Sequence, residues 1–147
     1  MNNTLFATPL DAEMAFYRAF AHRDLEAMMA VWSDDDENYC IHPNGIRLSG
    51  LMAIRESWRA LFATNTKLQF MLSQRQVIHS GMLAVHNLYE QITIIGQTST
   101  PQPLLATNIY LRGNLGWRMV AHHAAPAISI DTTQAAPDRK PPSTTLH

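Results

Sequence analysis

The feature that most constrains the fold is a change in the spacing of apolar residues at Lys67. Before Lys67 they recur at helical intervals, whereas after it come four long segments typical of strands. The segments are joined by short turns or by one polar loop with two prolines, residues 96–103. Successive strands with such connections predict an antiparallel meander that follows a helical region, which is an α+β chain. The predicted strands are 68–79, 82–95, 104–112 and 117–123.

Three amphipathic helices are predicted before this meander. Thr8 can cap the first helix ahead of Pro9, which suits the first helical position. Asp24 can cap the second helix, and Ser49 can cap the third. Between the second and third helices, a short hairpin pattern contains residues 39–48.

Composition limits the possible partners. A hydrophobic fraction of 46% supports a sizeable core for 147 residues, which fits one domain. Only 16% of residues are charged, and both faces of the strand segments 83–95 and 104–111 carry apolar side chains. We therefore expect the outer face of the sheet to meet a second copy and form a homodimer. A net charge of −1 predicts no nucleic-acid partner and no anionic membrane partner.

The ends of the chain and its single cysteine predict a cytoplasmic protein. Residues 1–4 have no signal-peptide pattern, and no apolar run approaches the ~18 residues of a membrane helix. One cysteine excludes an internal disulfide. Composition shifts to Thr, Pro, Ser and Ala after Pro126, so we expect a domain at 1–126 and a flexible tail at 127–147.

The order helix, helix, short hairpin, helix and four strands resembles the nuclear transport factor 2-like superfamily, which includes ketosteroid isomerases and SnoaL-like polyketide cyclases. Within it, the chain is most similar to small bacterial SnoaL-like proteins. The resemblance implies a cystatin-like fold in which a cone-shaped, curved antiparallel sheet wraps around three N-terminal helices. It also implies a pocket at the open end and dimerisation through the sheet. The segments that carry it are AFYRAF at 15–20, DLEAMMAVW at 24–32, CIHPNG at 40–45, IRESW at 54–58, ATNIY at 106–110 and GWRMVAHH at 116–123.

The resemblance does not extend to steroid isomerisation. Ketosteroid isomerases carry a tyrosine on the first helix, a base aspartate before a proline, and an acid aspartate on a later strand. Here Phe16 holds the place of the tyrosine, although Tyr17 is adjacent, and His42 precedes Pro43. No aspartate occurs in residues 37–130. The isomerase mechanism therefore cannot be transferred.

His42 and Glu90 are the predicted catalytic residues. A histidine titrates near neutrality, where a general base or acid works best, although a strand histidine can also be structural. Glu90 lies in the middle of an apolar strand; facing inward it would orient or activate the imidazole, and facing outward it would be a surface residue. An enzyme should place both at one cavity within hydrogen-bond reach, directly or through a substrate or water.

Seven further residues are predicted to line the pocket. By similarity to the kinase association domains of the superfamily, Asn108 and His122 point inward, and His123 then faces the other way. Tyr17 and Trp32 are residues of a kind more often found in the core, with pocket lining as the alternative. The predicted lining residues are Phe16, Tyr17, Trp32, Trp58, Phe62, Asn108 and His122.

No metal or cofactor is expected. A zinc site can be drawn from Cys40, His42 and one of His122 and His123, but the spacing matches no known motif. The prediction is a protein that binds a small apolar molecule, and if it is an enzyme, an isomerase, cyclase or dehydratase with His42 as base. The alternative is a non-catalytic dimeric module for ligand binding or assembly.

Overall fold

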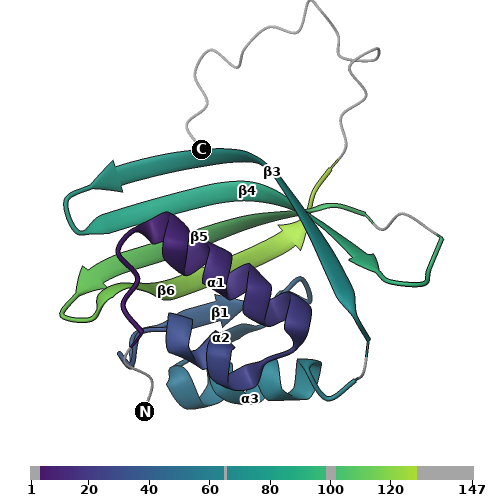
Figure 1. Cartoon of the computed structure of the whole chain (residues 1–147), viewed down its shortest axis with the longest axis horizontal. Coiled ribbons are helices and arrows are strands. Elements are labelled where there is room, and N and C mark those ends of the chain that lie inside the picture. Colours follow the sequence, from purple (N-terminus) through teal and green to yellow (C-terminus); the bar gives the residue numbers. More distant parts are fainter. Residues whose placement is uncertain (1–3, 65, 99–101, 129–147) are drawn as a thin grey trace, which may run out of the picture.

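The structure, a computed structural model, describes residues 4–64, 66–98 and 102–128 of the chain. Its described part forms three helices and one curved six-stranded sheet, so the predicted α+β cone is confirmed (Figure 1). In chain order the elements are α1 (Pro9–His22), α2 (Leu25–Val31), β1 (Tyr39–Ile41), β2 (Arg47–Ser49), α3 (Leu51–Leu61), β3 (Leu68–Ser80), β4 (Leu83–Ile94), β5 (Leu104–Gly113) and β6 (Gly116–Pro126).

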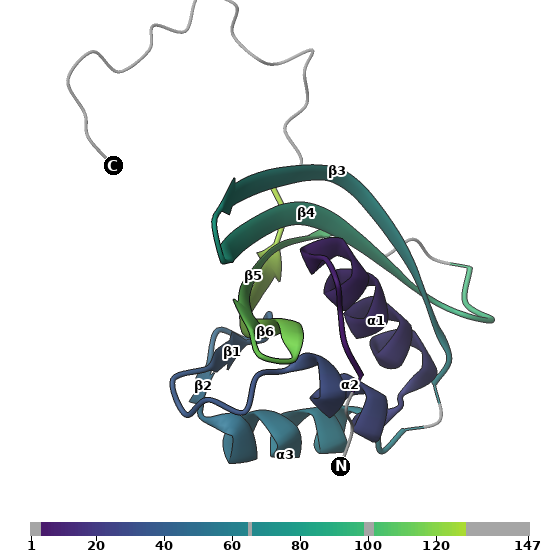
Figure 2. The same cartoon turned by 60° about the vertical axis from the view of Figure 1, so that its left-hand side comes forward.

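The meander β3–β6 and the hairpin β1–β2 join into a single sheet of order β2-β1-β6-β5-β4-β3. Neighbouring strands are antiparallel except β1 and β6, which pair in parallel. The sheet bends over α1, and α3 lies below the other two helices (Figure 2). The concave face of the sheet therefore surrounds α1. This helix supplies the polar side chains that lie inside the sheet.

Two of the three predicted helix caps are present. The Thr8 hydroxyl accepts a hydrogen bond from Asp11 N at 3.0 Å, and Asp24 Oδ1 accepts one from Ala27 N at 3.0 Å. The prediction for the third helix was wrong, because Ser49 ends β2 and Gly50 is the N-cap. Gly50 has φ 88°, which favours glycine, and it offers no side-chain acceptor to the first turn of α3.

A β-bulge interrupts β3 between Ser73 and Gln76, where Gln74 has φ 54°. A bulge bends its strand and changes the direction of nearby side chains. At this bulge Arg75 reaches α1, where it bonds Glu13. A second irregularity, opposite Ile109 and Tyr110, interrupts β6.

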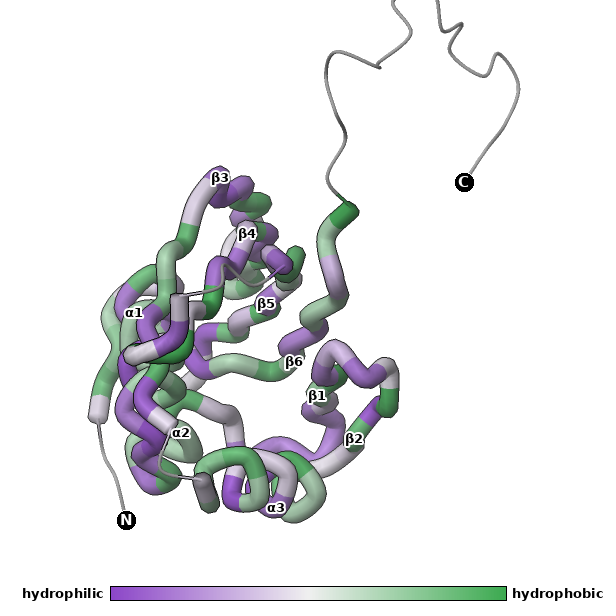
Figure 3. Tube along the Cα trace, turned by 90° about the vertical axis from the view of Figure 1, so that its right-hand side faces the viewer, coloured by the Kyte–Doolittle hydropathy of each residue, from purple (hydrophilic) through white to green (hydrophobic). Residues whose placement is uncertain are grey.

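The two faces of the central strands differ. Both β4 and β5 contain hydrophilic and hydrophobic residues (Figure 3). Burial alternates along them, and the inward residues are the buried ones, from Ala84 to Glu90 and from Ala106 to Tyr110. Outward apolar residues stay partly exposed, and Ile78 on β3 is 70% exposed. We call these outward residues the outer patch: Ile78, Val85, Tyr89, Leu105 and Ile109.

The C-terminal end of the described chain is still attached to the domain. Ala127 is buried, its N–H donates to Pro103 O at 2.9 Å, and its carbonyl accepts from Gln102 Nε2 at 2.7 Å. Most of the predicted tail, residues 129–147, lies outside the described residues. No helix in the described part of the chain is long and apolar enough to cross a membrane.

Candidate functional site

A single row of inward side chains crosses the sheet from β1 to β3. In register it consists of Cys40, His122, Asn108, His86 and Val77. The three central members are polar and almost fully buried. A row of buried polar groups requires hydrogen-bond partners, and α1 supplies them.

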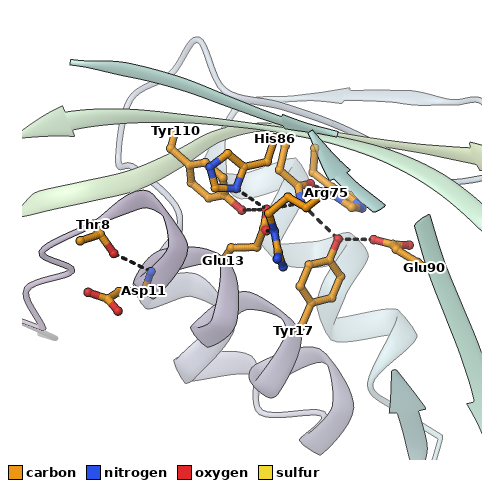
Figure 4. Close-up of polar contacts among 10 residues, drawn as sticks. Thr8, Asp11, Glu13, Tyr17, Arg75, His86, Glu90 and Tyr110 are labelled. Atoms are coloured by element: carbon orange, nitrogen blue, oxygen red, sulfur yellow. Dashed lines mark hydrogen bonds and ion pairs between the residues drawn. The ribbon is translucent and has the colours of Figure 1, made fainter. Parts of the chain in front are cut away.

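Glu13 on α1 is the centre of this polar network (Figure 4). It is fully buried, and its Oε1 accepts from Arg75 Nε at 2.6 Å. Its Oε2 accepts from Tyr110 Oη at 2.8 Å and from Asn108 Nδ2 at 3.1 Å. His86 Nδ1 also lies 3.1 Å from Oε2, but without the alignment of a hydrogen bond.

These contacts keep Glu13 ionised. Burial alone would raise its pKa, but the polar contacts from His86, Asn108, Tyr110 and Arg75 outweigh burial and lower the pKa to about 2. A fixed negative charge therefore lies beneath the middle of the sheet.

Tyr17 and Glu90 form the second part of the network. The Tyr17 hydroxyl donates to Glu90 Oε2 at 2.5 Å and accepts from Asn108 Nδ2 at 3.1 Å. Burial raises the pKa of Glu90 to about 7, the bond from Tyr17 opposes this rise, and the charge of Glu13 adds to it. The pKa of Tyr17 is raised well above its usual value by burial and by Glu90. The pKa of Glu13 is thus lowered and that of Glu90 is raised. Two nearby carboxyl groups with pKa values shifted in opposite directions are the arrangement found in acid–base sites.

The same network fixes the tautomer of His122. The Asn108 amide nitrogen faces Glu13 and Tyr17, so the amide oxygen faces His122 Nδ1 at 2.6 Å. Nδ1 must then carry the hydrogen, which leaves Nε2 with a free lone pair. Burial, with the nearby His42 and His123, lowers the pKa of His122 to about 3, so the ring is neutral at physiological pH. His123, the next residue, is exposed.

His42 lies outside this network. It is half-buried, with Nε2 3.1 Å from Ser57 Oγ and its ring 4.9 Å from that of Trp58. Ser57 Oγ donates to Ile54 O at 2.7 Å, so it accepts from His42 Nε2 and leaves Nδ1 as the basic nitrogen. Burial lowers the pKa of His42.

The structure forms no hydrogen bond between His42 and Glu90 in the part of the chain that it describes. Three strand spacings of about 4.8 Å separate β1 from β4, which is too far for direct contact along the sheet. The direct form of the predicted pair is therefore absent. A bridge through a substrate or water stays a prediction.

The predicted pocket-lining residues occupy three different places. Phe16 and Trp58 are fully buried and pack edge-on at 5.6 Å, and Phe16 lies 4.9 Å from the ring of His122. Trp32 lines a hollow of about 1060 Å³ beside α2, and Phe62 lines another of about 590 Å³ at the C-terminal ends of α1 and α3. Neither hollow is lined by His42, Glu90, Asn108 or His122.

Comparison with known proteins identifies the family. A model of the SnoaL-like domain matches residues 11–129. The chain belongs to the SnoaL-like domain family. A structure of a candidate calcium/calmodulin-dependent protein kinase type II association domain from Thiobacillus denitrificans is 41% identical, with a TM-score of 0.76. The match covers 84% of this chain and 98% of that one.

Two further relatives show in which other kinds of protein a similar domain occurs. A candidate dehydratase of the nuclear transport factor 2-like family from Streptomyces avermitilis is 30% identical over 80% of this chain and 92% of its own, with a TM-score of 0.72. F-box protein SKIP8 of Arabidopsis thaliana is 27% identical over 119 residues, or 81% of this chain. The chain spans about half the length of that curated relative, 49%.

Several members of this polar network were not predicted from the sequence. Glu13 precedes Tyr17 by one helical turn, and His86 shares the inward alternation of Glu90, so both carried a signal that could have been used. Arg75 carried none, because the bulge that brings it to Glu13 is not visible in an apolar pattern. Within the described residues no group of three His, Cys, Asp or Glu side chains is placed to hold a metal ion.

Proposed function

We propose that this SnoaL-like protein catalyses proton transfer on a small apolar substrate with a carbonyl or hydroxyl group, as an isomerase, cyclase or dehydratase. The observation that carries the proposal is the buried Tyr17–Glu90 pair, in which a carboxyl group with a pKa of about 7 accepts a 2.5 Å hydrogen bond. A group that titrates near the working pH can both give and take a proton.

In this proposal the ionised Glu13 keeps Glu90 basic enough to accept a proton. Its negative charge disfavours ionisation of Glu90, so Glu90 readily returns to the protonated state. Asn108 holds Tyr17 in place by donating to its hydroxyl oxygen.

His42 is assigned the second proton-transfer role. Its Nδ1 is the basic nitrogen once Nε2 donates to Ser57, and its pKa below the usual value keeps it neutral at physiological pH. The substrate would lie between His42 on one side and Glu90 on the other, in contact with the aromatic side chains of the interior. The similarity to a candidate dehydratase from S. avermitilis supports this class of reaction.

The test combines a binding screen with deuterium exchange. Thermal shifts against sterols, polyketide-like aromatics, terpenoid epoxides and short carboxylic acids would identify ligands. Each ligand with a carbonyl group is then incubated with the protein in D₂O, and deuterium uptake next to the carbonyl is measured by mass spectrometry. Wild-type protein should catalyse uptake, whereas Glu90→Gln and His42→Ala should each lose it. Uptake that persists in both variants would remove these residues from the mechanism.

A second candidate function is a non-catalytic module for ligand binding or assembly. It is favoured by the partly exposed outer patch and by the 41% identity to a candidate kinase association domain. An antiparallel sheet that presents apolar side chains on both faces gains stability when a second copy covers the outer face. In this role the buried network around Glu13 would serve only to hold α1 against the sheet.

A further inference from the structure

The hollow beside α2, of about 1060 Å³, is separate from the inner network. We call it the α2 hollow. It lies between α2, the start of α3 and the turn that joins β5 to β6, and its apolar walls include Leu51 and Leu115. Its volume is at the upper end of the range of roughly 300–1,000 Å³ that is typical of small-molecule sites.

Trp32 lines this hollow and has an indole N–H that is buried without a partner. Trp32, one of the lining residues, is 3% exposed, and its Nε1 has no hydrogen-bond acceptor within the described chain. A buried donor without an acceptor costs about 1–3 kcal/mol. An acceptor atom from a ligand would remove this cost.

The charges around the hollow favour an anionic acceptor. Arg112 and Arg118 both line it, and neither has a carboxylate within ion-pair distance in the described residues. Arg118 donates instead to the carbonyl oxygens of Trp117 and Thr4, and its guanidinium lies 4.9 Å from the Phe6 ring centroid.

Acidic residues only partly offset these two cations. Glu26 lines the hollow, but it already pairs with Arg55 at 3.5 Å. Asp34 also lines it and is exposed, and its charge acts on Arg118 without an ion pair in the described residues. Two arginines therefore face one carboxylate that is not held in an ion pair.

The start of α3 adds partial positive charge. Leu51, the first residue of this 11-residue helix, lines the hollow. The Gly50 N-cap offers no side-chain acceptor, and the first turn has no acidic residue. The amide groups at a helix N-terminus attract anions, more so when no side chain caps them.

We propose that the α2 hollow is a second binding site, which takes an apolar molecule with one carboxylate. The carboxylate would accept from one of the two arginines and, once the indole turns toward the hollow, from Trp32 Nε1. The apolar body would lie against Leu51 and Leu115. This site is independent of the proton-transfer site, because it shares no residue with the network around Glu13 and Glu90.

NMR of the three indole N–H groups tests the site directly, with 2-naphthoate as probe and 2-naphthalenemethanol as the uncharged control of matched shape. The chain has three tryptophans, and Trp32→Phe identifies the signal of Trp32. 2-Naphthoate should move that signal downfield, leave the Trp58 signal in place, and bind about tenfold more tightly than the alcohol. No change of the Trp32 signal, a change at Trp58 instead, or equal affinity for the alcohol would overturn the proposal.

Charge variants give a second test that does not depend on the fold of the Trp32 variant. Arg112→Gln and Arg118→Gln should weaken 2-naphthoate binding, together by about tenfold or more, whereas Asp34→Asn should tighten it about two- to fivefold. Asp36→Asn and Arg47→Gln change exposed residues that do not line the hollow, and they should leave the affinity unchanged. Equal responses of Asp34→Asn and Asp36→Asn would show that the hollow does not hold the carboxylate.

Discussion

The hydroxyl of Tyr17 on α1 donates a 2.5 Å hydrogen bond to Glu90 on β4, inside the sheet. One helical turn before Tyr17, Glu13 is ionised with a pKa of about 2, while the pKa of Glu90 is about 7. Asn108 and Tyr17 link Glu13 to Glu90 by hydrogen bonds, yet the pKa values of the two carboxyl groups differ widely. The difference follows from their contacts, because His86, Asn108, Tyr110 and Arg75 together lower the pKa of Glu13, whereas Glu90 has a single neutral donor.

Replacement of Glu90 by Gln should make stability less dependent on pH. The folded-state pKa of about 7 is above the usual 4.5, so ionisation of Glu90 destabilises the fold progressively as pH rises from 4.5 to 7. Between pH 5 and pH 8 the unfolding free energy of Glu90→Gln should rise by roughly 2 kcal/mol relative to wild type. Urea unfolding at four pH values measures this. Glu37→Gln, an exposed change, is the control, and parallel curves for wild type and Glu90→Gln would contradict a raised pKa.

Replacement of His122 by Gln should reduce acid sensitivity. The pKa of His122 is lowered from 6.5 to about 3, so the stability that its neutral form supports is present above pH 6.5 and is lost as pH falls towards 3. From pH 7 to pH 4 the wild type should lose about 3 kcal/mol more than His122→Gln. Urea unfolding again measures the difference. His123→Gln changes the exposed neighbour and should follow the wild-type curve.

Replacement of Glu13 by Gln should destabilise the protein by about 3 kcal/mol at pH 7, because Arg75 loses its charged partner and two other donors, Asn108 and Tyr110, face a weaker acceptor. Since the folded-state pKa is about 2, this stabilisation should fade as pH falls from 4.5 to 2. A double-mutant cycle with Arg75→Gln, measured by urea unfolding, should give a coupling of about 1–3 kcal/mol. Additive effects would show that the ion pair contributes little.

Glu13→Gln should also lower the pKa of Glu90, since the charge of Glu13 helps to raise it. Titration of ¹³C-labelled glutamate carboxyl signals by NMR measures this shift in a variant that remains folded. Arg75→Gln, which keeps the carboxylate, should shift the pKa of Glu90 in the opposite direction or leave it in place. A lower Glu90 pKa in both variants would indicate a general loosening of the core.

The sequence predicted the fold through features that act locally. The change of apolar spacing at Lys67 predicted the meander, and the caps at Thr8 and Asp24 predicted where two helices start. Ser49 failed as a cap because the chain turns one residue later, at Gly50, where a positive φ is needed. Parallel pairing of β1 with β6 was not visible, because it joins segments about 80 residues apart.

The site was only partly predictable because its geometry depends on long-range placement. Tyr17 meets Glu90 because the curved sheet brings β4 over α1, and no local pattern encodes that approach. Glu13 could have been singled out as an acidic residue beside an apolar stripe. The bulge that carries Arg75 inward could not have been predicted from the sequence. His42 was predicted within reach of Glu90, directly or through a substrate or water, and the direct partner that the structure gives it is Ser57.

Replacement of Ile109 by Lys should abolish the proposed dimer. Ile109 lies opposite Val85 at the centre of the outer patch, and a two-fold interface would contain it twice. Loss of two buried isoleucine side chains costs about 3–6 kcal/mol, which raises the dissociation constant by at least about 100-fold, before the added charge is counted. Sedimentation velocity from 1 to 100 µM measures the shift from dimer to monomer. Met52→Lys is the matched control, because Met52 is 88% exposed on α3 and lies away from the sheet. A wild-type protein that sediments as a monomer over this range would contradict the dimer, and equal sedimentation of both lysine variants would place the interface elsewhere.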